Sequence, residues 1–129
     1  DPEVPVKQRM EDFLRAICAN LAASPEFCKL FLRVIIDDDQ EREQWLVDKV
    51  SRNFKALGVP LKELAPGVED HFFLINTLMG SLVYHFATRD FSKLLPGYHQ
   101  RMGETAEFAD FLITIVDQWL AGLNAPSVE

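Results

Sequence analysis

The stretch HFFLINTLMGSLVYHF, residues 71–86, decides the fold of this 129-residue chain. Ten of its sixteen residues are large apolar or aromatic ones, and a histidine stands at each end. A membrane span needs about 20 apolar residues, but charged residues bracket these sixteen closely: Glu69, Asp70, Arg89 and Asp90. We therefore expect a helix that is buried on more than one side within a globular protein, and no membrane partner.

At about 100° per residue, this helix has three faces. The face with the most large apolar side chains is expected to be core; it holds Phe72, Ile75, Met79, Leu82, Val83 and Phe86. The second mixes aromatic with small residues: Phe73, Thr77, Gly80, Ser81 and Tyr84. The third is the stripe His71, Leu74, Leu78 and His85. A surface helix leaves about half of its circumference polar, whereas this helix leaves almost none.

The last helix, expected at about 104–123, has a similarly wide apolar arc, with Asp110 and Asp117 on the narrow remainder. Two adjacent helices with excess apolar surface can pair with the same two helices of a second copy, which gives an isologous four-helix bundle. The predicted dimer interface consists of Phe73, Thr77, Gly80, Ser81, Tyr84, Phe111, Ile115 and Trp119. The alternative is that shorter helices of the same chain cover these faces.

The remaining pattern is also helical, with apolar residues at three- and four-residue spacing. A first helix is predicted from about Pro5 to Ala23, with an inner stripe of Met10, Phe13, Leu14, Ile17 and Leu21. A second is predicted to start at Pro25, and a third to stop at Gly58, before Pro60. Pro66 is expected to open the helix that contains residues 71–86 and runs to about Thr88. The prediction is one all-α domain, residues 1–129, with five to six helices in an orthogonal or bundle arrangement.

The acidic run DDDQE, residues 37–41, has two interpretations. Asp38 and Glu41 have the spacing of a capping box, with Asp in place of Ser or Thr. A calcium loop would require a glycine and regularly spaced ligands, which are missing. We therefore expect helix capping here and no metal site.

Charge and cysteine content restrict the class of protein. The net charge is 13 − 20 = −7, so the chain lacks the basic surface that nucleic acids or anionic membranes require. Cys18 and Cys28 match no zinc spacing and are expected to be reduced, buried thiols of a cytoplasmic protein. The opening DPEVPVKQRM is no signal peptide, which suggests a processed protein or a piece of a longer one.

Catalytic and cofactor motifs are missing. His71 and His85 lie about 21 Å apart along a helix and cannot share a metal ion, and no Glu-x-x-His pair supports a di-iron site. No Gly-rich phosphate loop or Gly-x-Ser-x-Gly elbow occurs. We expect no enzyme and no cofactor, although haem ligation by a single histidine stays open. An apolar ligand site between helices is the other possibility, oriented by the polar groups of His71, Asn76, Thr77 and His85.

The order of these parts resembles a known family. SPEFCKLFLRVIIDD (24–38) is followed by EREQWLVDKVSRNFKALGVP (41–60), then by EDHFFLINTLMGSLVYHFATRDFSKLLPG (69–97) and AEFADFLITIVDQWLAGL (106–123). Together they are similar to the C-terminal regulatory domain of TetR-family transcriptional repressors. The similarity lies in the order of the helices and their general residue pattern more than in any invariant motif.

The resemblance implies a homodimer formed by the last two long helices and a cavity for a small hydrophobic or aromatic effector. It also implies a helix-turn-helix DNA-binding domain, which should precede residue 1, so that the chain itself binds no operator DNA. The implied ligand-binding residues are Phe13, Ile17, Phe31, Phe54, Phe72, Ile75, Asn76 and Met79. The alternative function is a helical interaction or oligomerisation module with a filled core and no small-molecule site.

Overall fold

The structure, a computed structural model, describes residues 4–124. This part of the chain is helical and contains no strand; its elements are α1 (Val6–Ala23), α2 (Pro25–Asp37), α3 (Gln40–Leu64), α4 (Phe72–Ala87), the short α5 (Arg89–Ser92), the 3₁₀ turn η1 (Gln100–Gly103) and α6 (Thr105–Asn124). The predicted all-α fold of five to six helices is therefore confirmed.

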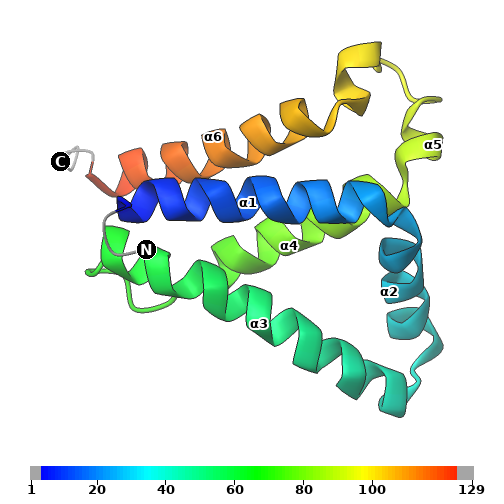
Figure 1. Cartoon of the computed structure of the whole chain (residues 1–129), viewed down its shortest axis with the longest axis horizontal. Helices are drawn as coiled ribbons and strands as arrows, with labels where there is room; N and C mark the ends of the chain where they lie inside the picture. The colour runs from blue at the N-terminus through cyan, green and yellow to red at the C-terminus, as the bar shows by residue number, and fades with distance from the viewer. Residues whose placement is uncertain (1–3, 125–129) are drawn as a thin grey trace, which may run out of the picture.

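α1 is the central helix of the fold (Figure 1). α6 packs along one side of it and α3 along the other, while α2 turns away and packs on α4. The inner side of α1 buries Met10, Leu14, Ile17 and Cys18. Because these residues recur every three or four positions, they form one continuous stripe toward the core. Phe13 and Leu21, the other members of the predicted stripe, are partly buried against it.

α4 provides the largest share of the core. Its buried residues are Leu74, Ile75, Leu78, Met79, Leu82, Val83 and Phe86, and His71 just before it is 5% exposed. Two of the three predicted faces are thus largely covered, with Phe72 as the exception at 53% exposed. No helix within residues 4–124 has both the length and the apolar content to cross a bilayer.

α3 is longer than predicted, because it continues through Gly58 and Pro60 to Leu64. A proline inside a helix has no N–H to donate and removes one backbone hydrogen bond. Here Pro60 is itself buried, as are Leu57 and Leu61, which are both 0% exposed. Burial of this last stretch offsets the lost hydrogen bond, so the local stop signal is overridden.

α4 also begins later than predicted, at Phe72 instead of Pro66. The residues before it form a connection, and the Asp70 carboxylate accepts a 2.7 Å hydrogen bond from the backbone N–H of Phe72. One free amide at the start of the helix is thereby satisfied.

The acidic run caps α3, as expected, but through a different residue. Asp39 is the N-cap, and its carboxylate accepts from the backbone N–H of Arg42 at 3.3 Å. Asp38 instead ends α2 in the left-handed conformation, with φ of 55°. Asp tolerates this conformation better than most residues, and it turns the chain from α2 into α3.

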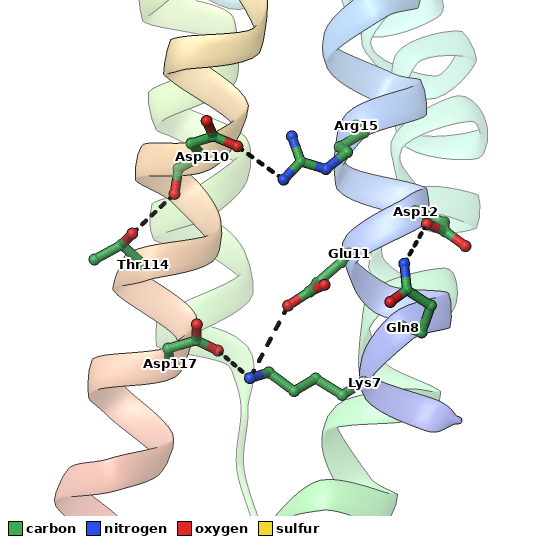
Figure 2. Close-up of polar contacts among 8 residues, drawn as sticks. All are labelled: Lys7, Gln8, Glu11, Asp12, Arg15, Asp110, Thr114 and Asp117. Atoms are coloured by element: carbon green, nitrogen blue, oxygen red, sulfur yellow. Dashed lines mark hydrogen bonds and ion pairs between the residues drawn. The ribbon is translucent and has the colours of Figure 1, made fainter. Parts of the chain in front are cut away.

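Ion pairs fasten α1 to α6 (Figure 2). Lys7 lies 3.0 Å from Asp117 and Arg15 lies 2.8 Å from Asp110, so two carboxylates of α6 point toward α1. The hydrogen bond and the charge of Asp117 raise the pKa of Lys7. Because these side chains are exposed, each pair contributes only about 0–1 kcal/mol. They therefore add little to the stability of the fold.

Candidate ligand groove and dimer face

An open groove runs between α2, α3 and the start of α4. Its volume is about 620 Å³, within the range of roughly 300–1,000 Å³ typical of small-molecule sites. Its apolar lining consists of Phe31, Ile35, Leu46, Val47, Val50, Phe54 and Phe72. Ile35, Val47 and Phe72 are each about half exposed, so the groove opens to solvent.

Three polar residues complete this lining: Glu43, Ser51 and Lys55. The Ser51 hydroxyl is already used, since it donates to the carbonyl of Val47 at 2.6 Å. Glu43 and Lys55 contribute one charge of each sign, and neither forms an ion pair within the described residues. The groove therefore suits an apolar body that carries one or two polar groups.

The groove gathers three of the predicted ligand-binding residues. Phe31, Phe54 and Phe72 come from three different helices, and the rings of Phe54 and Phe72 lie 5.8 Å apart. Whether these side chains contact a ligand stays a prediction.

The other five lie elsewhere. Ile17, Ile75 and Met79 are buried in the core, and Phe13 is partly buried against it. Asn76 is exposed and does not line the groove. The groove residues that the ligand prediction missed are Ile35, Leu46, Val47 and Val50. Their helical spacing indicates an inward direction, but it does not distinguish a packed neighbour from a hollow.

α4 and α6 run side by side in opposite directions. At one end the rings of His71 and Trp119 lie 5.6 Å apart. At the other end His85 stacks on Phe108, with ring centroids 3.8 Å apart and planes within 6° of parallel. These contacts place the outer surfaces of the two helices next to each other.

The surface formed by the outer sides of α4 and α6, which we call the α4/α6 face, is apolar and uncovered. Phe73 is 80% exposed, Tyr84 58% and Phe111 60%. Thr77 and Gly80 are exposed as well, and a Cβ added at Gly80 would meet no atom within 4 Å. The predicted interface residues closer to the α4–α6 contact are partly buried: Ser81, Ile115 and Trp119. No other helix within residues 4–124 covers this face.

The α4/α6 face is also poor in charge. α4 contains no Asp, Glu, Lys or Arg, and two of the three carboxylates of α6 pair with α1. The third, Glu107, pairs with Arg101 of η1 at 2.8 Å. A charge-poor surface that carries exposed aromatic side chains is characteristic of association sites.

Neither His71, which is buried, nor His85, which is partly buried, has the surroundings of a metal ligand. Both ring nitrogens of His71 and Nε2 of His85 are buried without a hydrogen-bond partner among residues 4–124. No cluster of three or more potential metal-binding side chains exists in this part of the chain. Burial, with a smaller contribution from Arg89, lowers the pKa of His85. The ring is therefore neutral at pH 7 and acts as an aromatic surface.

This shift predicts a pH-dependent stability. The ordinary pKa of His85 is 6.5, and its pKa in the folded chain is lower. At pH values between the two, the unfolded chain binds a proton at His85 that the folded chain does not bind. Stability is therefore fully present above pH 6.5 and decreases as the pH falls below it. Urea unfolding at pH 7.5 and 5.5 should show this loss, and His85→Gln should reduce it. His99→Gln, at an exposed site, is the matched control; an equal reduction there would contradict the assignment.

The two cysteines are buried and free, as predicted. Burial raises the pKa of Cys18 to about 11 and raises that of Cys28 as well. Because only the thiolate reacts, we expect negligible reaction with Ellman's reagent at pH 8 in the folded chain. Both thiols should react once the chain is unfolded in urea. Rapid reaction of the native protein would contradict the burial of these residues.

Comparison with models of known protein families, with curated proteins and with solved structures returned no match. The choice of a function therefore depends on the groove and on the α4/α6 face.

Proposed function

We propose that the chain is the regulatory domain of a TetR-like transcriptional repressor. In this proposal it homodimerises through the α4/α6 face and binds a small hydrophobic or aromatic effector in the groove between α2, α3 and α4. Effector binding then controls a DNA-binding domain that precedes residue 1. The support comes from the helix order quoted above and from the two surfaces.

The α4/α6 face is the observation that carries this proposal. Exposed Phe73, Tyr84 and Phe111 are unfavourable in an isolated chain, because burial of a large apolar side chain contributes about 1.5–3 kcal/mol. An antiparallel pair of helices can stack on its own symmetry mate as a four-helix bundle. A two-fold axis brings the same surface of each copy together, so one uncharged patch supplies both halves of the interface.

The groove supports the effector part. Its volume of about 620 Å³ accommodates a molecule of drug-like size, and its aromatic residues offer ring contacts. α4 forms part of both the groove, through Phe72, and the α4/α6 face, through Phe73. Movement of this helix on effector binding would therefore reach the dimer contact directly.

A helical interaction module without a small-molecule site is the second candidate. One observation favours it: Ile17, Ile75 and Met79 belong to a packed core instead of lining a cavity. In that case the groove would bind an apolar protein segment or nothing.

Native mass spectrometry tests the dimer first. The proposal expects a dimer and, where an effector has been co-purified, an additional small mass that denaturation removes. A monomer at all concentrations up to about 100 µM, far above the Kd of an obligate dimer, would overturn the dimerisation proposal.

The effector site is tested with N-phenyl-1-naphthylamine, a neutral apolar dye whose fluorescence rises on transfer from water. We expect saturable binding that Val47→Glu weakens by about tenfold or more, since it places a charge in the groove. Val59→Glu is the matched control, because Val59 is an equally exposed valine of α3, 58% against 53%, that does not line the groove. Equal losses for both variants, or no dye binding, would favour the interaction module.

A further inference from the structure

A second cavity lies at the opposite end of α4 from the groove. Its volume is about 820 Å³, it opens to solvent, and it is bordered by the start of α2, the end of α4 and the connection through α5 and η1 to α6. Figure 1 shows this connection at the end of the molecule where α2 begins. The cavity shares no lining residue with the groove, and nothing proposed above uses it.

Arg89 is the unusual group in this cavity. It is only partly exposed, and it lines the cavity with its guanidinium 5.6 Å from the centre of the Phe86 ring. One of its N–H groups donates to the carbonyl of Gly103 at 2.9 Å. A guanidinium has five N–H donors, and no carboxylate lies within ion-pair distance of this one in the described part of the chain. This is a partly buried cation without a counter-ion, in a chain of net charge −7.

The other basic residues of the cavity are already neutralised. Lys29 lies 3.6 Å from Glu26, and Lys93 lies 3.5 Å from Asp90. Glu104 adds a further carboxylate to the lining. With these two pairs set aside, the lining leaves one cation, Arg89, and one carboxylate, Glu104. A single negative charge is matched by Arg89, whereas the further charge of a phosphate would have no cation to pair with.

Apolar side chains line the same cavity. Leu95 and Met102 are 44% and 45% exposed, and the ring of His85, which is neutral at pH 7, lines the cavity as well. The Phe86 ring is only 1% exposed, so it supports the guanidinium from within the core. An anion held by Arg89 would thus have its remaining atoms against ring and methylene groups. This arrangement suits an anion with an apolar or aromatic body more than a small inorganic ion.

We propose that this cavity binds a small organic monocarboxylate, with the carboxylate on the free N–H groups of Arg89 and the apolar body against Leu95 and Met102. The planar fork of a guanidinium matches the two oxygens of a carboxylate. The proposal does not depend on the TetR-like function, because neither the groove nor the α4/α6 face contributes to it.

The first test is an NMR titration of the whole chain with benzoate, with benzamide as the uncharged analogue of the same shape. We expect saturable shifts of backbone amides within 85–89 and 98–104 for benzoate. Benzamide should bind at least about tenfold more weakly, the usual consequence of losing one charge-assisted contact. Equal affinities, no saturation with benzoate, or shifts confined to groove residues 43–55 would each overturn the proposal.

The second test replaces the cation. Arg89→Gln should abolish the preference for benzoate over benzamide, and Arg89→Lys should keep part of it, because the charge remains while the fork is lost. Arg33→Gln, at an exposed position of α2 outside the cavity, should leave the preference unchanged. A preference that survives Arg89→Gln would overturn the assignment. If that variant does not fold, the comparison of benzoate with benzamide on the natural chain decides.

These outcomes are separate from those of the dye experiment. Loss of dye binding with intact benzoate binding would contradict only the proposed effector groove, and the reverse would contradict only the carboxylate site.

Discussion

Replacing Gly80 with phenylalanine is expected to convert the proposed dimer into monomers while each chain stays folded. Within one chain the new side chain meets open space, because a Cβ at this position has no atom within 4 Å. Across a two-fold interface it would overpack both copies, at about 1–3 kcal/mol each. The dimer dissociation constant should therefore rise by about 30-fold to about 10⁴-fold.

Sedimentation velocity over a range of concentrations measures this change, and circular dichroism confirms that the helices remain. Gly80→Ala is the matched control. Alanine is small and a better helix former than glycine by about 1 kcal/mol, so it should leave the dimer in place and raise the thermal stability. If Gly80→Phe remains a dimer of unchanged affinity, the α4/α6 face is not the interface.

Replacing Leu78 with alanine should cause a large loss of stability. Leu78 is 0% exposed and belongs to the core cluster, to which α1, α2, α3, α4 and α6 all contribute. Its truncation removes apolar contacts and leaves a cavity, so we expect a loss of about 2–5 kcal/mol. Small domains have unfolding free energies of only about 5–15 kcal/mol, and this one change consumes a large part of that margin.

Urea unfolding followed by circular dichroism measures the difference. Leu94→Ala is the matched control, because Leu94 is the same residue type and is 81% exposed. Its truncation should change the unfolding free energy by no more than about 0.5 kcal/mol. Similar losses at both positions would mean that α4 is not packed as described.

The helices with a regular apolar repeat could be predicted from the sequence. α1 and α6 begin and end within about one residue of the predicted bounds, which is the usual uncertainty of helix ends. Their stripes are long, and the 3.6-residue period specifies both the helix and its inner side. The uncharged composition of α4 likewise predicts its burial, because so little of its circumference is polar.

The end of α3 could not be predicted in this way. Gly58 and Pro60 are local signals for a helix stop, but the burial of Leu57 and Leu61 depends on what α1 and α4 place opposite them. Tertiary packing outweighed the local preference, as it often does. The same applies to Asp38 and Asp39, two neighbouring carboxylates of which only the three-dimensional turn selects the cap.

The candidate sites, too, could be predicted from the sequence only in part. The exposed side of α4 follows from helical spacing, since Phe73, Thr77, Gly80 and Tyr84 recur at intervals of four, three and four. The groove could be predicted only as a set of aromatic residues, because packed and hollow interiors have the same residue types. The missing counter-ion of Arg89 could not be predicted from the sequence at all, because it depends on which carboxylates the fold brings near the guanidinium.

The pairing of α1 with α6 has a consequence for how the protein is made in the cell. The ribosome releases α1 long before α6, since they are the first and last described helices. Until α6 has been synthesised, the side of α1 that it covers stays open, and so does the adjoining side of α4. Contacts between distant parts of a chain form late and slow the folding reaction. Nascent chains should therefore expose apolar surface until α6 has been synthesised, which makes them clients for chaperones that bind such surfaces.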